Sequence, residues 1–408
     1  MLKNALSTIL LSITAAWTVS ADDWHRWRGP QLNGVSSEAG WLTQWPDGEP
    51  TVSWKASVGT GFSTVAVSKG RLYTMGNEDD VETVFCLDAD KGEVIWRHEY
   101  PCALDPKYFE GGPTSTPTID GDAVYTLSRR GHLFCFDATS GEIRWSKNVQ
   151  EETAAAIPSW GFSGAPLVHE ELLVINVGDS GMALHKESGD VIWKSEITES
   201  GYSTPYPYKV NDTQWAVILG SAKSYVAVDI KDGKELWRYR WLTRFGVNAA
   251  DPIVSGDQVF ISSGYNKGSA LLQLGTEEPK LIWKCKELRS QMNPSVLLDG
   301  YLYGTDGDAG NDATLKCIAW KTGEVKWSQK AIGTGGVTAA DGKLIVLTSR
   351  GELIVAPASP EKFQPITRAH VLGGKCWTCP VLSNGRIYCR NAAGDLVCID
   401  ARRPKPQD

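Results

Sequence analysis

The acidic stretch Asp306-Gly307-Asp308-Ala309-Gly310-Asn311-Asp312 is the strongest candidate for metal chemistry in the sequence. Alternating oxygen ligands around a glycine turn suit Ca²⁺, so Asp306, Asp308 and Asp312 are the candidate ligands. The bidentate Glu that completes an EF-hand loop does not follow Asp312. The same residues can form a polar hairpin turn, and the sequence favours this second interpretation.

Cysteine is the second residue type that could do chemistry, and the chain has nine. Cys376 and Cys379 form a C-x-x-C motif without the following His of a covalent haem site. A redox pair requires the start of a helix, whereas Pro380-Val381-Leu382 is typical of an opening strand. The pattern therefore favours a structural role for both thiols.

Nucleophile and metal motifs of other kinds are missing from the sequence. Ser163 lies in Gly161-Phe162-Ser163-Gly164, which differs from the G-x-S-x-G nucleophile elbow. The six histidines show no metal-ligand spacing. A net charge of −7 without a basic run argues against a nucleic-acid partner. The sequence contains no recognisable catalytic centre, so the catalytic residues are predicted to be none.

The segment from Cys135 to Trp145 indicates which secondary-structure elements position the candidate residues named above. Two apolar-alternating runs flank a turn rich in Asp, Thr, Ser and Gly, which predicts a β-hairpin. Cys86 to Trp96 repeats the pattern, and from Trp96 to Trp327 the repeated Trp residues follow one another at intervals of 44 to 49 residues. A period in the forties with several short strands per unit predicts the blades of a β-propeller. The repeated tryptophans are Trp54, Trp96, Trp145, Trp193, Trp237, Trp283 and Trp327.

Other repeat positions indicate scaffold and not chemistry. The Cys position is filled by Cys or Ala in different copies, so we expect a small buried side chain there. The repeat Asp is replaced by His185, Gly275 and Ala319 in three copies, which predicts a turn-forming role.

The pattern Ala/Cys-x-Asp-x-x-x-Gly-x-x-x-Trp resembles the tryptophan-docking repeat of quinoprotein-like (PQQ-like) β-propellers. That family includes PQQ-dependent dehydrogenases and the non-catalytic outer-membrane assembly lipoprotein BamB. The resemblance implies either a binding scaffold of the cell envelope or a quinoprotein oxidoreductase acting on alcohols or sugars. Many such dehydrogenases carry an adjacent Cys-Cys pair, which this chain lacks. We therefore expect no cofactor, with PQQ and Ca²⁺ as the alternative.

The repeats predict an all-β, eight-bladed propeller of four-stranded antiparallel blades over residues 51–401, followed by a short tail, 402–408. The strand around Trp54 has no neighbours of its own, and Asp395 to Asp400 is a third strand without a fourth. We expect these two strands to pair and close the ring.

The amino terminus is predicted to be a signal peptide over residues 1–21, with an amino-terminal anchor as the alternative. No Cys follows its apolar run, so the lipoprotein signal is missing and we expect a soluble, exported, periplasmic monomer. Residues 22–50 form a Trp-rich extension that contains Trp24, Trp27, Trp41 and Trp45. These large aromatics are expected to pack across the propeller flank.

The face that carries the connections between blades has the longest loops, and we expect binding there. Its candidate residues are aromatics at the channel mouth: Trp160, Phe162, Tyr202, Phe245, Tyr265 and Trp377. The alternative is that these side chains plug the channel. The expected partner is an envelope protein or peptide, or a small polar ligand. Acids near the rim, Asp179 and Asp306 among them, favour a basic or polar partner or a cation.

Overall fold

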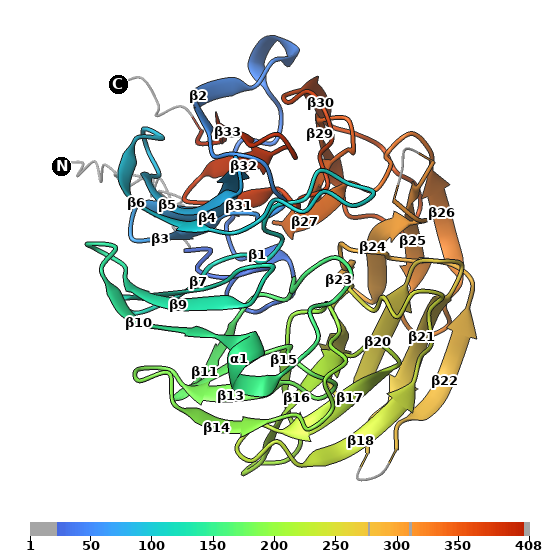
Figure 1. Ribbon diagram of the computed structural model, residues 1–408. Helices are drawn as coiled ribbons and strands as arrows, with labels where there is room; N and C mark the ends of the chain where they lie inside the picture. The colour runs from blue at the N-terminus through green and yellow to red at the C-terminus, as the bar shows by residue number, and fades with distance from the viewer. Residues whose placement is uncertain (1–22, 276–277, 310–311, 404–408) are drawn as a thin grey trace, which may run out of the picture.

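The computed structural model describes residues 23–275, 278–309 and 312–403. Their strands form eight sheets that surround a central channel (Figure 1). Each sheet contains four antiparallel strands, and one also has a short parallel strand at its inner edge. The predicted all-β, eight-bladed propeller is confirmed. The predicted signal peptide and residues 404–408 of the predicted tail lie outside the described residues.

The first four blades follow the chain from the inner to the outer strand. Blade one contains β3 (Ala66–Ser68), β4 (Arg71–Glu78), β5 (Val81–Asp88) and β6 (Val94–Pro101). Blade two contains β7 (Thr118–Asp120), β8 (Ala123–Leu127), β9 (His132–Asp137) and β10 (Ile143–Asn148), followed by the short helix α1 (Val149–Thr153). Blade three contains β11 (Leu167–His169), β12 (Leu172–Ile175), β13 (Met182–His185) and β14 (Val191–Lys194). Blade four contains β15 (Tyr206–Lys209), β16 (Trp215–Gly220), β17 (Ser224–Asp229) and β18 (Glu235–Arg240).

The remaining blades continue around the ring. Blade five contains β19 (Ile253–Ser255), β20 (Gln258–Ser263), β21 (Gly268–Gln273) and β22 (Lys280–Cys285). Blade six contains β23 (Val296–Leu298), β24 (Tyr301–Asp306), β25 (Thr314–Ala319) and β26 (Val325–Gln329). Blade seven contains β27 (Gly336–Ala340), β28 (Lys343–Leu347), β29 (Glu352–Pro357) and β30 (Thr367–His370), with β1 (Val35–Ser36) added to β27. Blade eight contains β31 (Val381–Ser383), β32 (Arg386–Arg390), β33 (Asp395–Asp400) and β2 (Thr51–Ser57).

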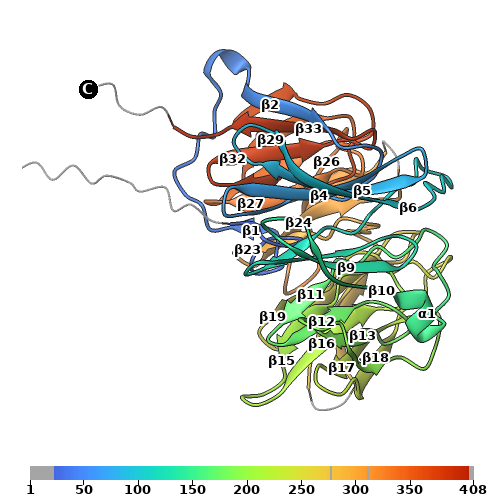
Figure 2. The ribbon, with the colours of Figure 1, turned by 60° about the vertical axis from the view of Figure 1, so that its left-hand side comes forward.

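Blade eight joins the two ends of the chain. Its outer strand β2 pairs with β33 from Thr51 opposite Asp400 to Ser57 opposite Asp395, as the sequence predicts. The two strands lie together in both views (Figures 1 and 2). The buried Arg390 strengthens the neighbouring junction, because its guanidinium donates to the carbonyl oxygens of Ser63 and Met75 in blade one. The ring is therefore closed by backbone pairing and by a side chain that crosses between blades.

The repeated tryptophans hold neighbouring blades together. The indole N–H of Trp193 donates to the carbonyl of Ile230 in the next blade at 2.9 Å. Its ring covers Gly233, where an added Cβ would lie 2.6 Å from the ring. The same donation to the next blade occurs at five further tryptophans: Trp54, Trp96, Trp145, Trp283 and Trp327.

Trp237 is the exception among the repeated tryptophans. Its indole donates to the hydroxyl of Tyr208 in its own blade at 2.8 Å. Blade five has lost the repeat sequence in its turn, and Gly275 has no atom within 4 Å of the position that its Cβ would take. The turn of blade five therefore offers Trp237 no docking contact.

The repeat Asp and Cys have the structural roles expected of them. The carboxylate of Asp137 accepts from the backbone N–H groups of Thr139 and Ser140 and so forms the turn. Cys135 is buried opposite Tyr125, and burial raises the pKa of its thiol to about 11. All four repeat cysteines lie opposite a Tyr on the second strand: Tyr73 with Cys86, Tyr125 with Cys135, Tyr303 with Cys317, and Tyr388 with Cys398. A Cys in this position therefore leaves room for the tyrosine ring.

The amino-terminal extension crosses the channel at the face of the short turns, which we call the short-turn face. Backbone hydrogen bonds join Trp24 to Val67 in blade one and His25 to Ile119 in blade two. The guanidinium of Arg28 donates to the carbonyl of Ser295 beside blade six. The segment ends at Glu38, whose carboxylate accepts from the backbone N–H groups of Asn384 and Gly385 in blade eight.

This course corrects part of the flank prediction. Trp24 and Trp27 lie at the channel, because the extension bonds to the inner strands and not to the outer ones. Trp41 and Trp45 do pack at the side of the ring, in the apolar cluster between blades seven and eight. The short 3₁₀ turn η1 (Pro46–Gly48) follows Trp45 and leads into β2.

Two deletions of different length would distinguish closure of the ring by β2 from closure of the channel by the amino-terminal extension. Removing residues 22–50 takes away the extension and leaves β2 in place, so we expect a destabilised monomer. Removing residues 22–57 also exposes the edge of β33, and an unpaired strand edge promotes aggregation. Size-exclusion chromatography should show aggregation for the longer deletion alone. A monomeric longer deletion with the melting temperature of the shorter one would contradict closure by β2.

Trp193→Ala should destabilise the fold by about 3–5 kcal/mol, because a large buried aromatic is replaced by a cavity. Trp193→Phe keeps one aromatic ring but loses the pyrrole ring and the hydrogen bond to Ile230, which should cost less, on the order of 1–3 kcal/mol. Urea denaturation gives both values. Trp237→Phe is the matched control, since its hydrogen bond stays within its own blade. Equal stability of Trp193→Ala and the parent would reject the docking role.

Candidate functional site

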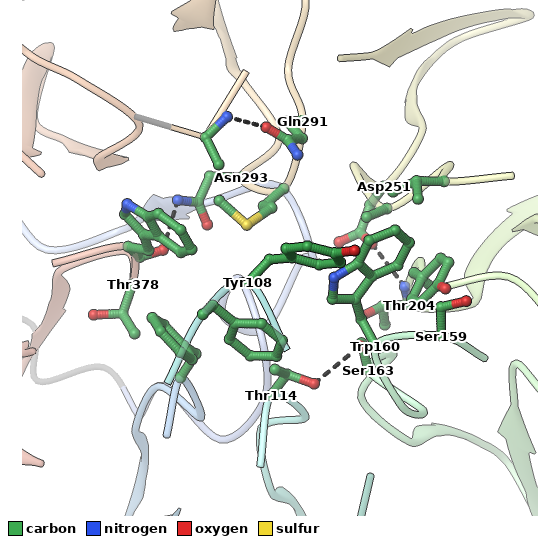
Figure 3. A pocket seen from close by; sticks show the side chains of 18 of the residues that line it. Tyr108, Thr114, Ser159, Trp160, Ser163, Thr204, Asp251, Gln291, Asn293 and Thr378 are labelled. Carbon is green, nitrogen blue, oxygen red and sulfur yellow. Dashed lines mark hydrogen bonds between the residues drawn. The ribbon is translucent and has the colours of Figure 1, made fainter. Parts of the chain in front are cut away.

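A cavity of about 700 Å³ opens among the loops between blades, on the face opposite the short turns. We call this face the long-loop face. The segments that lead into the inner strands supply most of its wall (Figure 3). Volumes of 300–1,000 Å³ are typical of ligand-binding pockets. The cavity is therefore large enough to take a small molecule or a few side chains of a partner.

Aromatic rings form two opposite walls of this cavity. On one side Phe62 contacts Phe109 and stacks on Trp377, with ring centroids 5.6 and 5.5 Å apart. On the other side the rings of Trp160, Tyr202, Phe245 and Tyr265 form a chain of contacts with centroid distances of 5.0 to 6.4 Å. Tyr108 projects beside the mouth with 91% of its surface exposed. Flat apolar surfaces therefore face each other across the cavity.

Five of the six predicted binding residues line this one cavity: Trp160, Tyr202, Phe245, Tyr265 and Trp377. Phe162 does not. Its side chain is fully buried and packs with Val149 and Leu133 in the core between blades two and three. Because the chain alternates direction at each residue of an extended segment, Ser163 faces the cavity and Phe162 faces the core. We therefore remove Phe162 from the candidate binding face.

Trp27 and Asp251 lie where the amino-terminal extension meets the cavity. The indole N–H of Trp27 donates to one carboxylate oxygen of Asp251 at 2.6 Å, and the backbone N–H of Thr204 donates to the other at 2.7 Å. Burial raises the pKa of Asp251 to about 6, and the nearby Arg28 guanidinium partly opposes that rise. Trp27 also lines a small void on its other side, so its ring separates the cavity from the short-turn face.

The amide side chains of the wall are already engaged. Asn293 donates to the carbonyl oxygens of Trp377 and Gly335, and Gln291 donates to the hydroxyl of Tyr265. Ser163 and Thr114 bond to each other at 2.9 Å. These hydrogen bonds fix the wall in place. What the wall offers a ligand is therefore mainly aromatic surface.

Sequence reasoning missed Trp27, Phe62 and Asp251 as cavity residues. The sequence does contain a signal for Asp251. Just before several inner strands, two residues separated by one position both line the cavity. Thr114 with Thr116, Tyr202 with Thr204, and Ala249 with Asp251 follow this register. Asp251 is the acidic residue among them. Trp27 could not be found in this way, since no repeat relates the extension to the blades.

The candidate Ca²⁺ ligands do not form a metal site. Asp306 is buried and its carboxylate is paired with Arg289 at 2.9 Å and Lys316 at 2.7 Å. The carboxylate of Asp308 accepts from the backbone N–H of Tyr265, and Asp312 is exposed. In the described part of the chain, no three His, Cys, Asp or Glu side chains group as metal ligands. The cations already neutralise Asp306, which supports the polar-turn interpretation.

The C-x-x-C thiols are also structural. Cys376 lies within 3.9 Å of the carbonyl oxygen of Gly373, and Cys379 lies within 3.6 Å of the amide oxygen of Asn293. Burial raises the pKa of Cys376 to about 12 and that of Cys379 to about 11. A reactive thiol requires a lowered pKa. The two thiols therefore fit packing and not redox chemistry.

PQQ with Ca²⁺ is the cofactor pair that the resemblance implies. PQQ is a planar tricarboxylate, so its site needs several cationic or hydrogen-bond donors, and Ca²⁺ needs six to eight oxygen ligands. The charged side chains of the cavity wall are Lys107 and Asp251, and Asp251 is already bonded to Trp27 and Thr204. The residues present do not fit this cofactor pair.

Fold and site together define an eight-bladed propeller of quinoprotein-like repeats with one aromatic cavity. The chain belongs to the family described as "Outer membrane protein assembly factor BamB", whose model matches residues 81–329, more than half of its length. The proteins of that name from Escherichia coli and Yersinia pestis are 24% and 23% identical to it. The match covers 74% of this chain and 87% of the first relative, and 86% and 88% for the second.

Solved structures show the same fold. BamB from Moraxella catarrhalis aligns with a TM-score of 0.63 and 16% identity over 88% of this chain and 99% of its own. The quinohemoprotein alcohol dehydrogenase from Comamonas testosteroni aligns with a TM-score of 0.66 and 14% identity over 95% of this chain and 82% of its own. These likenesses concern the fold alone. Over the described residues, no helix has the length and apolar character to cross a membrane.

The raised pKa of Asp251 predicts a pH dependence of stability. An Asp in an unfolded chain titrates near pH 4, so between about pH 4 and 6 the folded protein holds a proton that the unfolded chain has released. The contribution of Asp251 to the free energy of unfolding is then complete below pH 4 and is lost as the pH rises to 6. Asp251→Asn should remove a change on the order of 3 kcal/mol across this window.

Urea midpoints at several pH values measure this effect as a difference from the parent. Glu82, whose pKa burial raises to about 7, adds a pH dependence that parent and variant share. Asp212→Asn is the control, because the carboxylate of Asp212 is fully exposed. Parallel curves for the parent and Asp251→Asn would show that Asp251 titrates normally.

Proposed function

We propose that this protein is an exported, non-catalytic binding propeller of the cell envelope that captures a protein or peptide partner on its long-loop face. The observation that carries the proposal is the cavity with two aromatic walls, opening among the longest loops. Aromatic side chains dominate binding hot spots because they offer a large contact area at a low entropy cost. Family membership and the name of the relatives, an assembly factor, support a role in holding other proteins.

Capture fits this site better than catalysis. The carboxylate of the wall, Asp251, is placed to accept hydrogen bonds from an indole N–H and a backbone N–H, and not a proton from a nucleophile. The side-chain amides of Gln291 and Asn293 already donate hydrogen bonds within the wall. A rigid apolar wall is instead the arrangement that receives a preformed side chain without reorganising. Export to the periplasm through the amino-terminal segment remains part of the proposal.

The double variant Trp160→Ala and Trp377→Ala removes one ring from each wall and should abolish capture of the partner from an envelope extract. Both rings are half-buried at the cavity, so the melting temperature should fall by only a few degrees. The matched control is Ile95→Ala with Ile143→Ala, which removes exposed apolar surface from the outer strands of blades one and two.

Immobilised protein, washing and mass spectrometry of the retained proteins give the readout. Unchanged capture by the Trp160 and Trp377 double variant would place the binding site elsewhere. Reduction of an artificial acceptor by the parent after reconstitution with PQQ and Ca²⁺ would favour the quinoprotein alternative and overturn the proposal.

A further inference from the structure

Five basic side chains gather on the long-loop face beside the cavity, over blades four and five. Arg240 ends β18, Lys284 lies near the end of β22 and Lys286 follows it. Figure 1 shows β18 and β22 as the outer strands of adjoining blades. Arg244 lies in the connection between these blades, and Lys267 lies in the turn between β20 and β21. We call this group, Arg240, Arg244, Lys267, Lys284 and Lys286, the cationic patch.

The cationic patch lacks acidic partners. Of the acids that the structure describes, none lies within ion-pair distance of its five side chains. Nearby acids are paired with other cations: Asp179 with Arg238, Glu199 with Lys223, and Glu287 with Lys316. Burial and the repulsion of Lys284, Lys286 and Arg240 lower the pKa of Lys267. A concentration of unpaired positive charge is therefore built into a chain whose net charge is −7.

A buried tryptophan holds the patch in place. The ammonium groups of Lys267 and Lys284 lie 4.4 and 5.1 Å from the ring centroid of Trp241. Trp241 is itself fixed, because it is buried and its indole donates to Ser263 at 3.1 Å. Lys286 donates to the backbone carbonyl of Asn266 at 2.6 Å. Cation–π contacts and this hydrogen bond keep like charges close together that would otherwise separate.

The patch is continuous with the aromatic wall of the cavity. Arg244 precedes Phe245 and its guanidinium lies 5.1 Å from the centroid of that ring. Lys267 follows Tyr265 by two residues in the same turn. Phe245 and Tyr265 both line the cavity, and their centroids are 5.0 Å apart. A single extended segment could therefore contact the cations and place a side chain in the cavity.

We propose that the cationic patch docks an acidic polypeptide segment whose neighbouring apolar side chain enters the cavity. This inference rests on the proposed function and specifies the chemistry of the partner. It reverses the expectation of a basic partner, since Asp179 and Asp306 are held in ion pairs. An anionic membrane surface fits less well, because the cations lie on one side of the mouth and Lys375, at the opposite wall, is paired with Glu110.

Two short synthetic peptides test the proposal. Both contain a central Trp-Phe pair, flanked by Glu in one and by Lys in the other. Fluorescence anisotropy with the parent should show the Glu peptide binding at least about tenfold more tightly in about 0.05 M salt. The preference should vanish in about 0.5 M salt, because screening weakens exposed charge pairs.

The triple variant Arg240→Glu, Lys284→Glu and Lys286→Glu should lose the preference for the Glu peptide or reverse it. The matched control is Lys91→Glu, Lys231→Glu and Lys321→Glu, which makes the same change in net charge at exposed turns of the short-turn face. This control should bind as the parent does. An unchanged preference in the first triple variant would overturn the proposal.

The outcomes separate this inference from the proposed function. Equal binding of both peptides, lost in the Trp160→Ala and Trp377→Ala variant, would overturn the role of the cationic patch and leave the aromatic cavity as the site. Binding of neither peptide to the parent would overturn both. Patch-dependent binding to phosphatidylglycerol vesicles without binding of the Glu peptide would assign the patch to a membrane surface and reject the peptide.

Discussion

The docking of one indole on the glycine turn of the next blade is the interaction on which the rest of the structure depends. The indole N–H satisfies a turn carbonyl, and its ring lies where a Cβ on the glycine would collide. Where blade five has lost the repeat turn, Trp237 bonds within its own blade, whereas Trp327 still donates to Ser359 of a turn that has no glycine. The repeat residues therefore act mainly at the contacts between neighbouring blades and less within a single blade.

Contacts between neighbours cannot by themselves close a ring. The two ends of the chain must meet, and here β2 and β33 pair within blade eight while Arg390 bonds across to blade one. The amino-terminal extension adds a second constraint, because it is bonded to blades on opposite sides of the channel. The same segment thus fixes the diameter of the ring and blocks one end of its channel.

The sequence predicts most of the fold and about half of the aromatic side chains that line the cavity. The repeat of Asp, Gly and Trp indicates eight blades and their closure, because each residue acts within a local hairpin or on the adjacent one. We place the candidate aromatics by the strand that they precede: Trp160 and Trp377 line the cavity, whereas Phe162 lies in the core. That failure is a register error of one residue, and such an error turns a side chain from the cavity to the core.

The contribution of the extension could not be predicted, because it depends on contacts between residues far apart in the chain. Trp27 reaches Asp251 across 224 positions of sequence, and no repeat relates the extension to the blades. Ion pairing near the rim depends on the same kind of long-range contact. Acidic residues are conspicuous near the rim in the sequence, yet the fold pairs Asp179 and Asp306 with cations from other elements.

A channel that is open at both ends would hold solvent and would expose the inner strands on both faces. Trp27 lies between the cavity and the short-turn face, and the buried carboxylate of Asp251 accepts a hydrogen bond from its indole. A ligand must therefore enter and leave through the long-loop face, past the aromatic walls and the cationic patch. Selectivity can then reside in the loops, because the tryptophan-docking contacts lie on the outer strands and short turns, while the extension and the repeats keep the cavity in shape.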